Sequence, residues 1–225
     1  MYCAVIFDVD GTLVDSNDAH AQAWVEALAE SGRHVEFARV RPLIGMGSDK
    51  LLPEVSGLAA DSREGQAIAT RRGEIFMHRF LPRLRPTRGA RELVEWLHDD
   101  GLKLYVATSA KDEELQPLLH VAGAGRYMEA TASSDDADRS KPDPDIVVAA
   151  LQQTGRPKNE AIMIGDTPYD VEAALRAGIN IIALRSGGWR DRDLQHALAI
   201  YDDPADLLNH YDLSPFRRPA PARSA

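Results

Sequence analysis

The chain has 225 residues, 44% hydrophobic and 27% charged, which is the composition of an ordinary globular protein with a buried core. Its formal net charge of −9 repels polyanions, so we expect no nucleic-acid partner, and a phosphorylated ligand would need a local positive site. Cys3 is the single cysteine, which excludes a disulfide framework. The sequence has neither a secretory leader nor an apolar run of membrane-spanning length, and it implies no protein partner, so we expect a cytoplasmic protein without membrane contact.

One strand and a long helical stretch make up the first 82 residues. The apolar run 3–7 ends in Asp-Val-Asp-Gly-Thr, which predicts a buried strand that breaks into a loop. Apolar residues at helical spacing predict a helix over 17–31, with Asn17 or Asp18 as its N-cap. Residues 36–80 look helical throughout, with breaks at the 45–48 turn and at Pro53.

After residue 82, strands and helices alternate. We expect strands at 102–107, 127–131, 161–164, 180–184 and 199–201, and helices at 87–100, 112–121, 144–154, 169–177 and 204–209. Thr87 is expected to cap the first of these helices. This alternation predicts an α/β fold with a parallel sheet covered on both faces.

The predicted architecture is a Rossmann-like sheet core made of residues 1–15 and 83–213. A small all-helical cap, residues 16–82, is inserted after the first strand. It would therefore lie over the C-terminal ends of the strands, where open parallel sheets bind ligands. Residues 214–225 hold three prolines and three arginines, which predicts a frayed, disordered tail.

Polar residues with related chemistry fall at this predicted sheet edge. Several carboxylates would crowd there and raise one another's pKa unless a cation compensates them. Oxygen ligands of this kind suit Mg²⁺, while a lysine and hydroxyl groups would hold a phosphoryl group. The carboxylates are Asp8, Asp10, Asp166 and Asp170; the other polar groups are Thr108, Ser109 and Lys141.

The four motifs together resemble the haloacid dehalogenase-like superfamily, in the branch whose helical cap follows the first motif. They are Asp8-x-Asp10-Gly11-Thr12, Thr108, Lys141 and Gly165-Asp166-x₃-Asp170, and the similarity covers about residues 3–210. The resemblance implies that Asp8 is the nucleophile and a Mg²⁺ ligand, and that Asp10 is the general acid and base, with a backbone carbonyl on the metal. It also implies that Thr108, Ser109 and Lys141 bind phosphate.

In the same resemblance, Asp166 is the third protein ligand of Mg²⁺, and Asp170 binds it through water or supports the site. The implied reaction is Mg²⁺-dependent hydrolysis of a small phosphorylated metabolite, a sugar phosphate or a phosphoglycolate-like compound, through an aspartyl-phosphate. Asp10 favours phosphoryl chemistry over dehalogenation, because a leaving alkoxide needs a proton and a leaving halide does not.

A sugar phosphomutase of the β-phosphoglucomutase type stays as the alternative. His20 and Trp24, four residues apart on one helical face, fall where those relatives carry a His and a Trp, and we expect both at the substrate. Against the mutase, Gly165 precedes Asp166 where the mutase has Glu, and the 45–49 turn lacks the mutase's arginine. The pair Arg71-Arg72 is interpreted as a solvated helix face and left out of the site.

Overall fold

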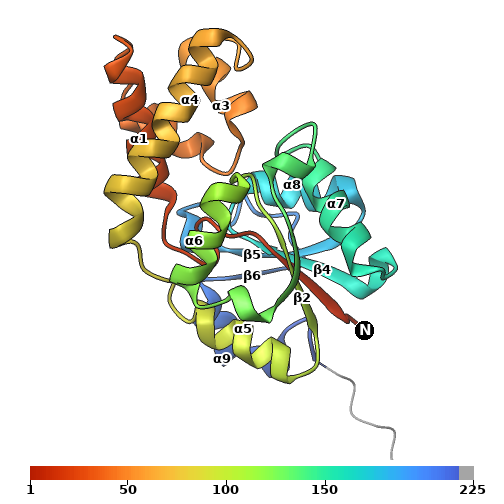
Figure 1. Cartoon of the computed structure of the whole chain (residues 1–225). Helices are drawn as coiled ribbons and strands as arrows, with labels where there is room; N and C mark the ends of the chain where they lie inside the picture. Colours follow the sequence, from red (N-terminus) through yellow and green to blue (C-terminus); the bar gives the residue numbers. More distant parts are fainter. Residues whose placement is uncertain (218–225) are drawn as a thin grey trace, which may run out of the picture.

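The computed structural model describes residues 1–217, built around a six-stranded parallel sheet with strand order β3-β2-β1-β4-β5-β6 (Figure 1). From β1 the chain moves outward through β2 to β3, and then returns to the other side of β1 with β4. Ligands of open parallel sheets bind at such a switch point. The strands are β1 Ala4–Phe7, β2 Lys103–Ala107, β3 Met128–Ala132, β4 Ala161–Gly165, β5 Asn180–Leu184 and β6 Ala199–Tyr201.

Helices cover both faces of this sheet, as the alternating pattern predicted. Successive residues of β1 enter different clusters: Val5 packs with the cluster that contains Leu93, and Ile6 with the cluster that contains Ile146. Such alternation follows from the two-residue period of a strand. One face carries α5 Ala90–Asp99, α6 Asp112–Ala122 and α9 Pro204–Asn209; the other carries α7 Asp145–Thr154 and α8 Pro168–Ala177 (Figure 1). The predicted α/β fold class is confirmed.

Residues 16–82, here called the helical segment, form a separate group of helices beyond the sheet (Figure 1). The two connections to the sheet lie side by side, because the Asp15 amide donates to the Arg85 carbonyl and the Thr87 amide to the Leu13 carbonyl, both at 3.0 Å. The segment holds α1 Asn17–Glu30, α2 Phe37–Val40, α3 Ser48–Ser56 and α4 Arg63–Ile75, followed by one π-helical turn at 76–80.

Three local predictions are wrong. Thr87 does not cap α5, which begins three residues later with Gly89 as its N-cap; the Thr87 amide donates to Leu13, and its hydroxyl makes no hydrogen bond within residues 1–217. Pro53 does not break the chain but lies inside α3, where it leaves one carbonyl of the preceding turn without an amide donor. Neither Asn17 nor Asp18 caps α1, whose N-cap is Ser16.

The predicted frayed tail begins too early. Ser214 and Phe216 are both buried, and the Phe216 ring stacks on Tyr211 and meets Tyr2 edge-on. Residues 218–225, the rest of that prediction, lie outside the described residues. Within residues 1–217, no helix is long and apolar enough to cross a membrane.

Candidate active site

Asp8 lies at the switch point of the sheet, one residue beyond β1. Its amide still donates to the Ile164 carbonyl on β4 at 2.9 Å, so the backbone stays fixed to the sheet while the side chain turns out at its edge. The Lys141 ammonium donates to Asp8 Oδ1 at 2.5 Å and to the Ala107 carbonyl at 2.8 Å. The structure thus brings together Asp8 and Lys141, which are 133 residues apart.

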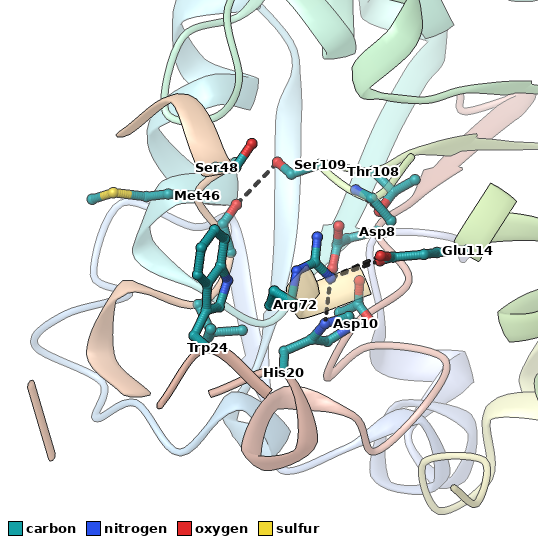
Figure 2. A pocket seen from close by; sticks show the side chains of 14 residues that line it. Asp8, Asp10, His20, Trp24, Met46, Ser48, Arg72, Thr108, Ser109 and Glu114 are labelled. Atoms are coloured by element: carbon teal, nitrogen blue, oxygen red, sulfur yellow. Dashed lines mark hydrogen bonds and ion pairs between the residues drawn. The ribbon is translucent and has the colours of Figure 1, made fainter. Parts of the chain in front are cut away.

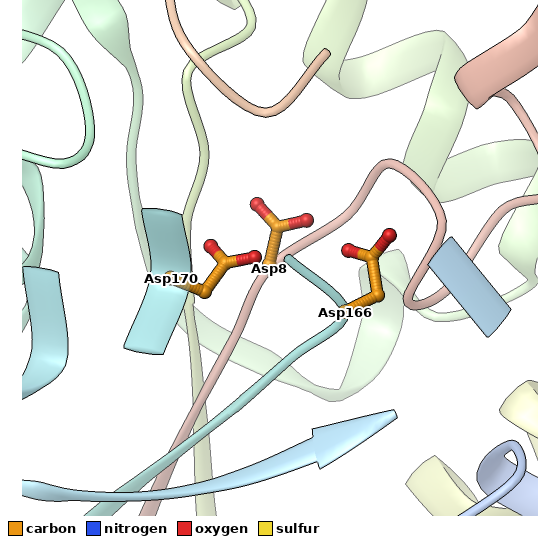
Figure 3. A group of neighbouring side chains, drawn as sticks. All are labelled: Asp8, Asp166 and Asp170. Carbon is orange, nitrogen blue, oxygen red and sulfur yellow. The ribbon is translucent and has the colours of Figure 1, made fainter. Parts of the chain in front are cut away.

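Asp166 follows β4 and is completely buried beside Asp8 (Figure 3). Thr12 donates to its Oδ1 at 3.1 Å, and the Asn17 amide donates to its Oδ2 at 2.8 Å. Glycine leaves room for this carboxylate: a Cβ on Gly11 would lie 2.1 Å from Asp166 Oδ2, and one on Gly187 would lie 2.4 Å from the same atom. Asp166 is therefore fixed by groups from three separate parts of the chain, of which only Thr12 and Gly11 belong to a predicted motif.

Asp170 serves two structural purposes. Its Oδ2 accepts from the Thr167 amide at 3.0 Å and from the Thr167 hydroxyl at 2.6 Å, which completes the capping box of α8. Its Oδ1 lies 2.8 Å from Lys141 Nζ. Asp170 thus takes part in the cap of its own helix and also belongs to the group of carboxylates around Asp8.

The three carboxylates form a group with the character of a metal site. Asp8, Asp166 and Asp170 each offer an oxygen, and these oxygens lie within 4.8 Å of one another (Figure 3). Burial raises the pKa of Asp8 well above its ordinary value, and the neighbouring carboxylates raise it further against the charge of Lys141. Burial and Asp170 likewise raise the pKa of Asp166.

Those shifts mean that Lys141 alone does not compensate the carboxylates. The pKa of Lys141 is itself raised: burial acts to lower it, but Asp170 and Asp8 outweigh that effect. A group of carboxylate oxygens whose negative charge exceeds the positive charge of Lys141 suits a hard divalent cation such as Mg²⁺. Asp8, Asp166 and Asp170 could each offer one oxygen to such an ion.

Asp10 points away from this group toward the helical segment. Ser16 donates to its Oδ1 at 2.5 Å, and His20 Nε2 lies 2.8 Å from the same oxygen. Burial acts to raise the pKa of Asp10, but the contact with His20, the Ser16 hydrogen bond and the charge of Arg72 together lower it below its ordinary value. Asp10 is thus poised as a carboxylate that accepts hydrogen bonds.

The remaining predicted residues line one pocket with Asp8 and Asp10 (Figure 2). Thr108 is buried, and its hydroxyl accepts from the Ala110 amide at 3.1 Å. Ser109 donates across to the Gly45 carbonyl of the helical segment at 3.1 Å. His20 stacks on Phe76 with ring centroids 3.8 Å apart. Trp24 is 4% exposed, so it is both a core residue and part of the pocket wall.

The interpretation of Arg71-Arg72 as one solvated face is wrong for Arg72. Arg71 is exposed and pairs with Glu30 and Glu74 on the surface, but Arg72 is buried in the pocket wall. Arg72 Nη1 contacts Glu114 Oε1 at 2.8 Å and His20 Nδ1 at 3.4 Å. Consecutive residues of a helix lie on different faces. The sequence does not show which face is covered; the packing of α4 against α1 and the contact of Arg72 with Glu114 on α6 show it.

Further polar contacts hold the helical segment against the sheet domain. The Gly47 amide donates to the Ser140 hydroxyl at 3.0 Å, and that hydroxyl donates to Asp49 at 2.5 Å. Lys50 pairs with Asp143 at 2.8 Å and also donates to the Ser140 carbonyl. These contacts place the 45–50 turn directly beside the loop that carries Lys141.

Comparison with known proteins agrees with this geometry. A family model described as haloacid dehalogenase-like hydrolase matches residues 5–184. The chain belongs to this family. The phosphoglycolate phosphatase of Pseudomonas syringae pv. syringae is 32% identical over 211 residues, which cover 91% of this chain and 78% of the relative.

Solved structures of the family share the whole fold. A hydrolase from Pseudomonas syringae is 32% identical with a TM-score of 0.87, covering 93% of this chain and 98% of that one. A structure assigned as a β-phosphoglucomutase from Bacteroides vulgatus is 27% identical with a TM-score of 0.82, covering 94% and 88%. The family membership, the phosphatase relatives and the carboxylic acid at position 10 together show that the protein is a phosphoric monoester hydrolase.

Proposed function

We propose that this protein is a Mg²⁺-dependent phosphatase of a small phosphorylated metabolite, with Asp8 as the nucleophile that becomes an aspartyl-phosphate. The observation that carries the proposal is the position of Asp8. It lies within hydrogen-bonding distance of Lys141, belongs to the group of three carboxylates, and shares an open pocket with Asp10. Small hydroxy-acid phosphates such as phosphoglycolate, and sugar phosphates, are the candidate substrates.

In the first half-reaction, Asp8 Oδ attacks phosphorus and the ester oxygen leaves with a proton from Asp10. In the second, Asp10 takes a proton from the water that attacks phosphorus, and the acyl phosphate on Asp8 breaks to give inorganic phosphate and the free Asp8 carboxylate. Lys141 holds the phosphoryl oxygens against Asp8. Thr108 offers its hydroxyl proton at the pocket wall and Ser109 its backbone amide, since the Ser109 hydroxyl donates to the Gly45 carbonyl. Asp8, the Asp10 carbonyl and Asp166 would hold Mg²⁺, with Asp170 supporting the site; when bound, the ion offsets the charge of Asp8 and the phosphoryl group.

The Asp10 carboxylate needs a proton before the first half-reaction. A phosphoryl dianion bound beside Asp8 would raise the pKa of Asp10, because a nearby negative charge disfavours an ionised carboxyl, and Asp10 would then take up the proton. Ser16 and His20 then keep the side chain where the leaving oxygen is expected. Proton transfer of this kind contributes roughly 10²- to 10⁴-fold to the rate.

Phosphate release from an aryl phosphate, with Mg²⁺ or with EDTA, tests the proposal. We expect turnover only with Mg²⁺, none from Asp8→Asn, and a kcat lowered by roughly 10²- to 10⁴-fold in Asp10→Asn. Asp15→Asn is a matched control, since Asp15 is exposed and lies outside the pocket. Full activity in EDTA, or turnover by Asp8→Asn, would refute the nucleophile assignment.

The likeness to the Bacteroides vulgatus structure keeps a mutase as the second candidate. A mutase must bind a second phosphate, and the pocket wall offers three carboxylates, Asp8, Asp10 and Glu114, against the one arginine, Arg72. Incubation with β-glucose 1-phosphate and a bisphosphate primer separates the two activities. Efficient formation of glucose 6-phosphate would favour the mutase.

A further inference from the structure

Arg72 is the one lysine or arginine among residues 1–217 whose side chain lines the active-site pocket (Figure 2). Lys141 is fully buried and contacts Asp8 at 2.5 Å, but it is not among the residues that line the pocket. The Arg72 residue is only 8% exposed, and its Nε is buried with no hydrogen-bond partner in the described part of the chain. A buried guanidinium with an unused donor is costly unless another group, such as a ligand, satisfies it.

The surroundings of Arg72 hold it in a fixed orientation. Its guanidinium carbon lies 5.3 Å from the centre of the Trp24 ring, within cation–π range. Both Glu114 carboxylate oxygens contact the same nitrogen, Nη1, at 2.8 and 2.9 Å. The residue after Arg72 is glycine, and a Cβ there would lie 3.3 Å from Glu114 Oε1, closer than ordinary contact. One edge of the guanidinium is therefore occupied by Glu114, while Nε is not.

Arg72 lies on the side of the pocket where the leaving group of the substrate is expected. His20 contacts Asp10 through Nε2 and Arg72 through Nδ1, so Arg72 is two contacts away from the proposed general acid. The phosphoryl group belongs at Asp8 and Lys141, and the ester oxygen at Asp10. The next part of the substrate, the organic group of the alcohol, is thus the part that Arg72 can meet.

We propose that Arg72 binds a carboxylate of the substrate, so that the enzyme prefers phosphate monoesters of small hydroxy acids. This inference rests on the proposed phosphatase function and names its substrate class. Arginine suits the role, since it can donate two parallel hydrogen bonds to a carboxylate. A second phosphate is less suited, because Glu114 already shares the charge of Arg72 and a dianion beside it would be repelled more strongly than a monoanion.

The test compares two monoesters of similar size, 2-phosphoglycolate and 2-hydroxyethyl phosphate, with saturating Mg²⁺. The readout is the ratio of their kcat/KM values. A variant that only loosens the contact between the helical segment and the sheet domain lowers kcat/KM for both substrates alike and leaves this ratio unchanged. We expect the ratio to fall roughly 10- to 100-fold in Arg72→Gln, as for a lost hydrogen bond to a charged group, and to recover in part in Arg72→Lys. Arg71→Gln, at the exposed neighbour, is the matched control and should keep the wild-type ratio.

Glu114→Gln gives a second measurement that keeps Arg72 in place. Removal of the competing carboxylate should lower KM for 2-phosphoglycolate relative to 2-hydroxyethyl phosphate, so the ratio should rise. An equal fall for both substrates in Arg72→Gln, or an unchanged ratio in Glu114→Gln, would overturn the proposal. If the wild type releases phosphate from neither monoester, the phosphatase proposal fails instead, and the two failures are thereby distinguished.

Discussion

Asn17 is expected to set the affinity of the enzyme for Mg²⁺, although no motif contains it. Its buried amide donates to Asp166 Oδ2 at 2.8 Å, and Thr12 holds the other oxygen at 3.1 Å. Asn17→Ala removes a hydrogen bond to a charged group, an interaction of about 1.5–3 kcal/mol. Loss of a group that orients a metal ligand typically lowers metal affinity by roughly 10- to 100-fold.

The assay is phosphate release as a function of Mg²⁺ concentration. We expect Asn17→Ala to need roughly 10 to 100 times more Mg²⁺ for half of its maximal activity, with most of kcat recovered at saturation. We expect the substitution to lower the folding stability less than the loss of a side chain with all its hydrogen bonds made. Asn17 Oδ1 is buried with no partner within residues 1–217, and removing this atom removes the penalty of its burial.

A matched control lies on the same helix. The Gln22 side chain donates to Glu26, one turn further along α1, so Gln22→Ala should keep the wild-type Mg²⁺ dependence. If Asn17→Ala folds normally and is activated at the wild-type Mg²⁺ concentration, then the Asn17 contact does not orient a metal ligand, and the assignment of Asp166 as a ligand loses its support.

Three further outcomes are expected. Lys141→Met should lower the free energy of unfolding by about 3–5 kcal/mol, measured by urea denaturation without metal, because it leaves Asp8 and Asp170 as unpaired buried charges. Asp166→Asn should make the metal-free protein more stable at neutral pH. Because the pKa of Asp166 is raised in the folded state, the folded state binds this proton more tightly than the unfolded state, and the stability of the wild type falls as the pH rises from about 3.8 toward the raised value. The melting temperatures of the wild type and of Asp166→Asn should therefore converge at the acidic end of that range. Gly187→Ala should impair Mg²⁺ activation, since its Cβ would lie 2.4 Å from an Asp166 oxygen; unchanged activation would show that the loop shifts freely.

The sequence was sufficient for the sheet and for the residues at its carboxyl edge. Short apolar runs that end in polar motifs define parallel strands, and parallel strands bring their ends together whatever the distance between them in the chain. That is why Asp8 and Asp166 could be placed near one another from pattern alone. Glycine and proline were less informative as signs of where helices end: Gly89 is the N-cap of α5, with a positive φ of 76°, and Pro53 lies within α3.

Contacts between the helical segment and the sheet domain could not be predicted in the same way. Arg72 and Glu114 are 42 residues apart, and Asn17 and Asp166 are 149 apart. Neither pair shares a motif or a period, and each depends on how one group of helices packs against another. Asn17 was interpreted as a helix cap because a short polar side chain at a helix start usually caps it, yet its amide is used by Asp166 instead.

The charges of the site imply an order of binding. Asp8, Asp166 and Asp170 together with Lys141 carry two net negative charges when all are ionised, and one divalent cation neutralises them. A phosphoryl dianion that reached Asp8 before the cation would meet this negative charge in a buried site, where water screens it weakly. A bound cation removes the repulsion and leaves Lys141 free to contact the phosphoryl oxygens. The metal is therefore expected to bind first, which would make it a condition for substrate binding as well as for the chemical step.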